Sequence, residues 1–317
     1  MGFRKVLVNL EATPSCPAAC AMCPRDLISD QGYMSIETME KVISQVDTSM
    51  SWEIDLAGRG EPTLHPQLLE LAKIMARPGV LTGIVTTGVA MTPPNVEALE
   101  KHFGVIRLSV SSYVRSIFEK VHIGLNFEKI WRNVETLARV GAHKTVIHLT
   151  GGPVIYDGLP ETVAHLRKLG FQRFKLLTLW NRGGHFQSNE DRDRRKALIS
   201  ELGLETGEDE VWASEGRMRF VSDIAFNKLR NPKYCPIGAS SVSISYKGDI
   251  LGCFQDFGHI SVVGNVHQMD IRTHLERRYS ELGNMKICQG CDAHKVSLFQ
   301  VAQTKKREAP LPAISSS

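Results

Sequence analysis

Short apolar runs rich in β-branched residues alternate with amphipathic stretches along the first part of the 317-residue chain. A period of two in the apolar positions predicts strands, and a period near 3.6 predicts helices, so the alternation indicates βα units around a parallel sheet. The expected strands are residues 5–10, 52–56, 81–86, 105–110, 145–149 and 173–179. The expected helices are residues 35–46, 66–76, 94–102, 127–140 and 159–169, with Ser35 as the first N-cap.

The pattern changes after the sixth expected strand. Residues 188–195 are strongly charged, and residues 196–202 favour a helix. Apolar residues then flank the turn Lys247-Gly248-Asp249, which predicts a hairpin of residues 241–246 and 250–253. A further helix is expected at residues 271–282.

Six strand–helix repeats are fewer than the eight of a closed barrel, so we expect an open one. The predicted fold class is α/β, with a partial (β/α)6 TIM-like barrel followed by a small α+β domain. The expected division is a barrel (1–185), a connecting helical segment (186–232), the small domain (233–305) and a disordered Pro/Ser-rich tail (306–317).

Composition narrows the possible classes of protein. The chain is 42% apolar, enough for a full core, and its net charge of +4 comes from Lys and Arg spread along the sequence. This distribution does not favour nucleic-acid binding. No stretch approaches the roughly 20 apolar residues of a membrane span, and the N-terminus lacks the apolar run of a signal peptide. We therefore expect a cytoplasmic protein without membrane contact, whose seven cysteines serve metal or redox chemistry.

Three cysteines follow the first expected strand with the spacing Cys16-x3-Cys20-x2-Cys23. A loop after a barrel strand lies at the C-terminal mouth, where barrel active sites are built. Three thiolates can bind three irons of a 4Fe–4S cube and leave the fourth iron open for another ligand. A zinc site or a chance grouping is the alternative, but zinc favours C-x2-C pairs and four ligands, and no histidine follows at ligand spacing.

The run Cys-x3-Cys-x-Met-Cys-Pro-Arg resembles the cluster loop of radical S-adenosylmethionine (SAM) enzymes. Met22 stands where that family often has an aromatic residue, and the resemblance implies an adenine contact through its backbone. Gly58-Arg59-Gly60-Glu61-Pro62 is similar to the family's glycine-glycine-glutamate motif, which binds the SAM amino group. Arg59 departs from the two adjacent glycines, whereas Gly60, Glu61 and Pro62 fit.

Two further segments resemble parts of that family less specifically. They are Thr86-Thr87-Gly88 after the third strand and Ser109-Val110-Ser111 on the fourth. The resemblance implies that Thr87, Ser109 and Ser111 contact the ribose and carboxylate of SAM, and ordinary barrel packing is the alternative. It extends over roughly residues 5–184.

The other four cysteines are Cys235, Cys253, Cys288 and Cys291. Four thiolates in two pairs can hold either zinc or a complete 4Fe–4S cube, and spacing alone favours zinc. After a radical SAM barrel, however, the arrangement resembles the twitch domain, a shortened SPASM domain that carries one auxiliary 4Fe–4S cluster. Three plus four cysteines would then leave no free thiol as a hydrogen-atom donor, which favours oxidation over epimerisation.

Two side chains are the candidates for contact with a substrate. Arg182 follows the sixth strand in Asn181-Arg182-Gly183-Gly184, a loop that presents polar groups to a ligand or to solvent. Asp256 follows Cys253 and either binds or deprotonates a substrate or caps the hairpin.

The resemblance implies a dehydrogenase similar to those of aminoglycoside antibiotic pathways, acting on a small polar substrate. Its cofactors would be SAM and two 4Fe–4S clusters, and an external reductant such as flavodoxin or ferredoxin would supply electrons. A 5′-deoxyadenosyl radical would take hydrogen from a carbinol carbon, and the auxiliary cluster would accept the second electron to give a ketone. The alternatives are a radical epimerase, an enzyme that modifies a ribosomal peptide, and a non-enzymatic zinc module on a degenerate barrel.

Overall fold

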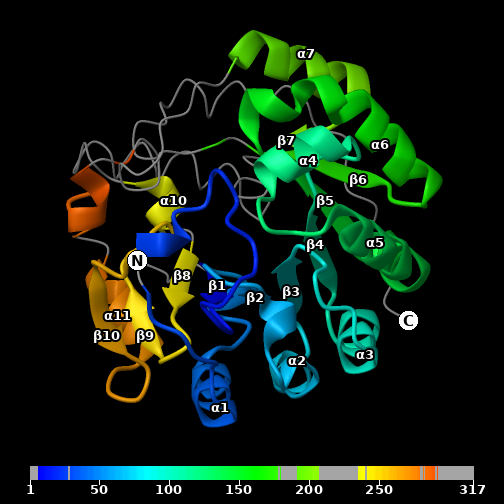
Figure 1. Cartoon of the computed structure of the whole chain (residues 1–317). Helices are drawn as coiled ribbons and strands as arrows, with labels where there is room; N and C mark the ends of the chain where they lie inside the picture. Colours follow the sequence, from blue (N-terminus) through cyan, green and yellow to red (C-terminus); the bar gives the residue numbers. More distant parts are fainter. Residues whose placement is uncertain are drawn as a thin grey trace.

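The computed structural model describes residues 6–27, 29–177, 179, 191–206, 235–239, 241–278, 281, 283–289 and 291. In that part of the chain, one curved sheet has the strand order β10-β9-β8-β1-β2-β3-β4-β5-β6-β7 (Figure 1). Its strands are β1 (Val6–Leu10), β2 (Ser51–Leu56), β3 (Leu81–Thr86), β4 (Val105–Ser109), β5 (Thr145–Leu149), β6 (Arg173–Leu176), β7 (Glu205–Thr206), β8 (Ser241–Ile244), β9 (Asp249–Leu251) and β10 (Val262–Asn265).

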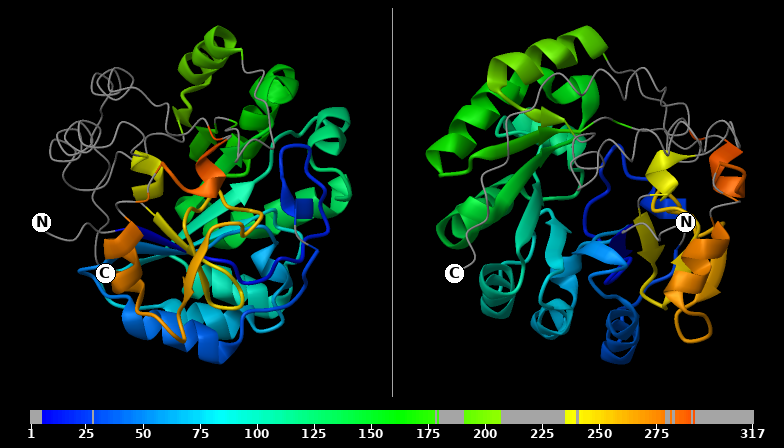
Figure 2. Two further views of the ribbon diagram at one scale, coloured as in Figure 1. Left: turned by 90° about the vertical axis from the view of Figure 1, so that its left-hand side faces the viewer. Right: turned by 180° about the vertical axis from the view of Figure 1, so that it is seen from behind.

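Helices cover the outer, convex side of the sheet, as both views in Figure 2 show. The helix caps follow the expected chemistry: Ser35 Oγ accepts from the Thr38 N–H at 3.0 Å, and Asn126 Oδ1 accepts from the Lys129 N–H at 2.8 Å. The α-helices are α1 (Ile36–Gln45), α2 (Leu68–Met75), α3 (Pro93–Lys101), α4 (Arg115–Val121), α5 (Phe127–Gly141), α6 (Leu159–Lys168), α7 (Arg192–Leu202), α10 (Pro236–Ala239) and α11 (Ile271–Arg278). Short 3-10 turns include η2 (Pro62–Leu64), η4 (Gly152–Gly158) and η5 (Lys286–Gln289).

The two faces of the parallel sheet differ in composition. Residues paired across neighbouring strands share a face, and Val8, Ile54 and Ile84 lie on the face beneath the outer helices, where each is wholly buried. The inner face carries polar side chains instead, namely Asn9, Glu53, Asp55, Arg107, Ser109, His148, Lys175 and Ser243. The apolar core therefore lies between sheet and helices, and the interior of the open barrel is polar.

The partial barrel predicted from the sequence is confirmed, with some differences in its strands and helices. Strands β7 and β8 extend the parallel sheet beyond six strands, since β7 pairs with β6 and β8 pairs with β1. The sixth strand ends at Leu176 rather than at 179, and α7 begins at Arg192 rather than at 196. Helix α4 is an additional element. None of the described helices is long and apolar enough to cross a bilayer.

The hairpin expected near the C-terminal end forms as β8 and β9, which pair antiparallel. It is continuous with the barrel, because β8 also pairs in parallel with β1 from Leu7–Ser241 to Leu10–Ile244. The structure therefore joins the first strand of the chain to the segment that contains the last four cysteines.

Candidate functional site

The loop between β1 and α1 carries Cys16, Cys20 and Cys23, all partly buried. Backbone hydrogen bonds fasten it on two sides. The Glu61 N–H donates to the Ser15 carbonyl at 2.9 Å, which joins the loop to the turn after β2. The N–H groups of Ala19 and Ala21 donate to carbonyls of residues 123 and 121 at 2.7 and 3.1 Å, which joins it to the end of α4. The loop is thus held in shape by neighbouring barrel connections.

The three thiols influence one another electrostatically. Burial raises the pKa of Cys20 to about 12, and the charges of Cys23 and Cys16 add to that increase. Burial also raises the pKa of Cys16. Bound iron replaces these protons, because thiolates and not thiols are the ligands.

Within the described residues, no group of three or more His, Cys, Asp or Glu side chains is arranged to hold a single metal ion. A 4Fe–4S cube makes a different demand, since each thiolate binds a different iron and the sulfurs stand farther apart. Three partly buried sulfur donors on one loop therefore fit a cube, in which each binds a different iron, better than one ion.

Glu61 links the turn after β2 to the turn after β3. It is 2% exposed, and its Oε1 accepts hydrogen bonds from Thr63 N (3.1 Å), Thr63 Oγ1 (2.7 Å) and Thr86 Oγ1 (2.6 Å). Its Oε2 accepts from the N–H and the hydroxyl of Thr87, both at 2.7 Å. Glu61 also caps η2, which begins at Pro62. Two residues of the predicted SAM site, Glu61 and Thr87, therefore contact each other directly.

Gly60 allows two loops to approach closely. A Cβ added at this position would lie 1.9 Å from the Thr13 carbonyl oxygen, in the loop that carries the cysteines. A residue without a side chain is therefore needed at position 60 to admit the neighbouring loop.

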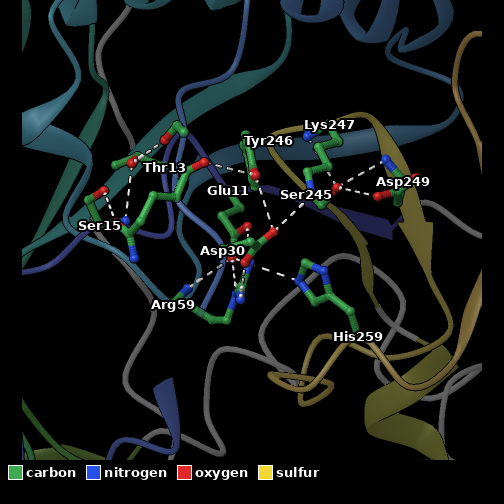
Figure 3. Close-up of polar contacts among 12 residues, drawn as sticks. Glu11, Thr13, Ser15, Asp30, Arg59, Ser245, Tyr246, Lys247, Asp249 and His259 are labelled. Atoms are coloured by element: carbon green, nitrogen blue, oxygen red, sulfur yellow. Dashed lines mark hydrogen bonds and ion pairs between the residues drawn. The ribbon is translucent and has the colours of Figure 1, made fainter. Parts of the chain in front are cut away.

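Arg59, the residue that departs from the family motif, has a clear role in the structure. It is 4% exposed, and its Nε and Nη2 donate to the two carboxylate oxygens of Glu11 at 2.8 and 2.9 Å (Figure 3). Its Nη1 donates to Asp30 Oδ1 at 3.1 Å. Burial lowers the pKa of Arg59, but the hydrogen bonds to the two carboxylates outweigh it and hold that pKa above its usual value. The side chain joins β1, the turn after β2 and the cysteine loop.

Asp30 extends this network to the C-terminal hairpin. Its Oδ2 accepts hydrogen bonds from Tyr246 Oη and Lys247 Nζ, both at 3.1 Å, and Figure 3 shows these residues converging on it. Burial raises the pKa of Asp30, but hydrogen bonds from Lys247 and Arg59 outweigh it and keep that pKa below its usual value. His259 lies at the border, with Nε2 3.9 Å from Glu11 Oε2 and a φ of 47° that few non-glycine residues adopt.

His122, the C-cap of α4, contacts the cysteine loop. Its Nδ1 lies 3.5 Å from Cys20 Sγ, and the Ser111 N–H donates to its Nε2 at 3.3 Å. Ser111 is fully buried, and its hydroxyl donates to the Thr150 carbonyl. The side chain of this predicted SAM contact therefore bonds to protein groups, whereas Ser109 lies on the polar inner face beside His148.

The four remaining cysteines lie on separate elements. Cys235 precedes α10, Cys253 follows β9, Cys288 is in η5 and Cys291 follows it. Local N–H groups already face two of the sulfurs: Gly238 N–H donates to Cys235 Sγ at 3.3 Å, and Gln255 N–H to Cys253 Sγ at 3.4 Å. Burial raises the pKa of Cys288. Their common cluster stays a prediction.

The two candidate substrate residues have different outcomes. Arg182 lies outside the described residues. Asp256 is 1% exposed, and its two oxygens accept from the N–H groups of Ile260 (3.0 Å) and Ser261 (2.8 Å). It thus caps its loop, which is the second of the two roles considered for it. Met22, the remaining predicted contact, packs partly buried against the core.

Sequence reasoning missed His122 and Glu11. A single histidine at the end of a short helix gives no periodic signal, and Glu11 stands next to a strand like many surface carboxylates. The one available sign was Arg59, an unexpected charge in a glycine-rich turn that required a buried partner.

Comparison with known proteins finds similarity to one superfamily. Residues 10–167 match the model described as the Radical SAM superfamily. The chain is 26% identical over 258 residues to a PqqA peptide cyclase of Ruegeria pomeroyi, covering 77% of this chain and 66% of that protein. It is 29% identical over 174 residues to a tungsten-containing aldehyde ferredoxin oxidoreductase cofactor-modifying protein of Pyrococcus furiosus, covering 51% of this chain and 48% of that protein. The chain thus spans about half to two thirds of these relatives.

Solved structures share the fold. Streptococcus suis SuiB bound to its precursor peptide SuiA superposes with a TM-score of 0.69 at 16% identity, over 97% of this chain and 74% of that one. BtrN in complex with AdoMet and 2-DOIA superposes with a TM-score of 0.57 at 16% identity, over 92% and 94%. These likenesses show the fold, an α/β partial TIM barrel shared with those structures, and residues 10–167 within it match the radical SAM superfamily model.

Proposed function

We propose that this chain is a radical SAM oxidoreductase in which Cys16, Cys20 and Cys23 hold a SAM-binding 4Fe–4S cluster. The observation that carries the proposal is the cysteine loop, which presents three partly buried thiols after β1 and is bonded to the Glu61 turn. Three sulfur donors leave one iron of a cube open. When bound, the cluster and SAM supply a carbon radical that abstracts hydrogen from a substrate.

The SAM site is assigned to residues around that loop, namely Met22, Gly60, Glu61, Pro62, Thr87, Ser109 and Ser111. The carboxylate of Glu61 already accepts five hydrogen bonds from threonine groups. In this proposal Glu61 holds the turn after β2 and the turn after β3 in fixed positions, so that their backbone groups face the ligand. Arg25 donates to the Cys16 carbonyl and adds a positive charge beside the thiolates.

The polar inner face of the barrel supports a small polar substrate, such as an aminoglycoside or another sugar-like molecule. Asn9, Ser109 and Ser243 share that face and offer both donors and acceptors to hydroxyl and amino groups. Apolar substrates would leave these groups without partners.

Oxidation of a carbinol to a ketone removes two electrons and two protons from the substrate. One hydrogen atom leaves with the SAM-derived radical, a base takes the hydroxyl proton, and one electron remains. A second cluster held by Cys235, Cys253, Cys288 and Cys291 would supply the acceptor for that electron, and this is why we assign dehydrogenation. Both oxygens of Asp256 accept hydrogen bonds from its own loop, and Arg182 lies outside the described residues, so substrate contact by either residue stays a prediction.

Anaerobic reconstitution with iron and sulfide tests this proposal. We expect about eight irons per chain, corresponding to two cubes. With flavodoxin or ferredoxin as reductant, Cys20→Ala should form no 5′-deoxyadenosine. Cys253→Ala should still form it but lose the product that is two mass units lighter than the substrate. About four irons with one zinc would disprove the two-cluster assignment, and 5′-deoxyadenosine without a lighter product would disprove dehydrogenation. Solvent deuterium in a product of otherwise unchanged mass would instead indicate an epimerase.

Modification of a ribosomal peptide is the second candidate. The observation that favours it is the 26% identity with a PqqA peptide cyclase over 77% of this chain. The test is incubation of the reduced protein with short peptides encoded beside its gene. A peptide that loses two mass units or gains a crosslink, while aminoglycosides remain unchanged, would replace the sugar proposal with this one.

A further inference from the structure

The contact between Cys20 and His122 is built into the fold. His122 is 2% exposed, and its Nδ1 lies 3.5 Å from Cys20 Sγ. The backbone hydrogen bonds of Ala19 and Ala21 flank Cys20, and they end on the residues that flank His122. Two residues later Gly124 has a φ of +89°, and a Cβ there would lie 2.8 Å from the Pro17 carbonyl oxygen. The two segments therefore run close together with Cys20 opposite His122.

Hydrogen bonding identifies the proton-bearing nitrogen of the ring. Two groups of Ser111 face Nε2, its N–H at 3.3 Å and its hydroxyl oxygen at 3.1 Å. A backbone N–H can only donate, so Nε2 presents a lone pair to it. An imidazole carries at least one proton, which must then be on Nδ1, the nitrogen that faces the sulfur. Ser111 is held in turn by Thr150, whose N–H donates to the Ser111 hydroxyl at 3.3 Å. Ser111 and Thr150 thus fix the ring from the side opposite Cys20. Groups outside the ligand shell orient metal ligands in the same way in many sites.

We propose that His122 is a positioning residue that donates an N–H···S hydrogen bond to the Cys20 thiolate and thereby sets the reduction potential of the cluster. The inference rests on the proposed function, because it requires a cluster on Cys16, Cys20 and Cys23. A reduced cluster carries one more negative charge than an oxidised one, so a donor at a ligand sulfur stabilises the reduced form more. The hydrogen bond therefore makes the cluster easier to reduce.

Two substitutions separate this hydrogen bond from simple packing. His122→Phe keeps a buried ring but removes both nitrogens, whereas His122→Asn keeps a donor attached to Cγ, where Nδ1 stood. Both variants remove Nε2, so the difference between them reports on the donor toward Cys20. His65→Phe is the matched control, because His65 is also 2% exposed but bonds to the Met34 carbonyl and the Gln67 N–H, not to a cysteine.

The experiment is a redox titration of the reconstituted full chain, followed by electron paramagnetic resonance. The signal of this cluster is the one absent from Cys20→Ala. We expect a more negative midpoint potential in His122→Phe and a potential near that of the wild type in His122→Asn and His65→Phe. Pulsed measurements should detect an exchangeable proton coupled to the wild-type cluster, lost in deuterated buffer and in His122→Phe.

The outcomes distinguish this inference from the function on which it rests. If the wild type acquires no signal that depends on Cys20, the proposed function itself fails. If the signal forms but His122→Phe leaves both its potential and its proton coupling unchanged, only the role of His122 is wrong. An equal shift in His122→Phe and His122→Asn would likewise overturn it, because packing and not the donor would then control the potential.

Discussion

Two buried arginines, Arg59 and Arg107, each stand between two carboxylates, but they behave differently. Arg59 joins Glu11 and Asp30 at the mouth of the barrel. Arg107, on the inner face, donates from Nη1 to both oxygens of Asp55 at 2.9 Å and from Nη2 to Glu53. The two groups have the same formal composition, one cation and two anions.

The surroundings decide whether both carboxylates are charged. Asp30 is about a quarter exposed and receives a second cation, Lys247, and its pKa is lowered. Glu53 is 1% exposed, and burial together with the charge of Asp55 raises its pKa to about 9 despite Arg107. At the mouth two cations therefore balance two carboxylates, whereas on the inner face Glu53 keeps its proton. The greater burial of Glu53 and the additional lysine beside Asp30 account for the opposite pKa shifts.

The largest effect is expected from Arg59→Met. It leaves the buried Glu11 without its cation, and breaking a buried pair in this way typically destabilises a protein by about 3–5 kcal/mol. Chemical denaturation measures the loss, and Glu11→Gln added to Arg59→Met should recover part of it. The matched control is Arg115→Met, since Arg115 is half exposed beside Glu119. Equal losses in the two variants would mean that the mouth network has no special role.

Gly83→Ala tests the inner group. Gly83 lies on β3 between the strands of Asp55 and Arg107, and an added Cβ would be 1.7 Å from Asp55 Oδ1 and 2.7 Å from Arg107 Nη1. The ion pair must then move, and we expect a destabilisation of about 1–3 kcal/mol. Unfolding curves would show it, and an unchanged midpoint would indicate that the pair adapts without strain.

Glu53→Gln should change how stability depends on pH. The pKa of Glu53 is higher in the folded chain (about 9) than its ordinary value of 4.5, so the folded state binds the extra proton between these pH values. This contribution to the free energy of unfolding is complete below about pH 4.5 and is lost as the pH rises through about 9. Relative to the wild type, the variant should therefore become more stable as the pH rises through that window. Denaturation at pH 5 to 8 tests it, and a constant difference would contradict the raised pKa.

The smallest effect is expected from Lys247→Met. Lys247 is 56% exposed, and an exposed ion pair contributes no more than about 1 kcal/mol. The variant should therefore unfold close to the wild type at moderate salt, in contrast to Arg59→Met. A loss as large as that of Arg59→Met would show that the lysine and the arginine act as one unit.

The periodic parts of the fold were predictable from sequence. β3 and β5 match their predicted ranges to the residue, because their apolar runs are bounded by polar segments. α4 was missed because its seven residues include Arg115, Glu119 and Lys120 and are too few for a clear stripe. The two residues of β7 carry no pattern at all. The pairing of β8 with β1 joins distant parts of the chain and leaves no local trace.

At the site, spacing and motif located the cysteine loop and Glu61, because both depend on short fixed distances along the chain. The partners of Glu61 could not be predicted, since Thr86 and Thr87 reach it from another strand. The same limit applies to His122, which meets Cys20 only after α4 has turned back toward the mouth. Contacts between side chains on different loops can be identified only in the folded structure.

The parallel pairing of β1 with β8 affects how the chain can fold during its synthesis on the ribosome. β1 emerges first, yet one of its edges acquires its hydrogen-bonding partner only when Ser241–Ile244 has been synthesised. Until then that edge offers unpaired N–H and C=O groups to any other strand. A nascent chain with this topology folds through non-local contacts, which are slow to form and prone to aggregation. Expression at low temperature or with chaperones should therefore increase the yield of soluble protein.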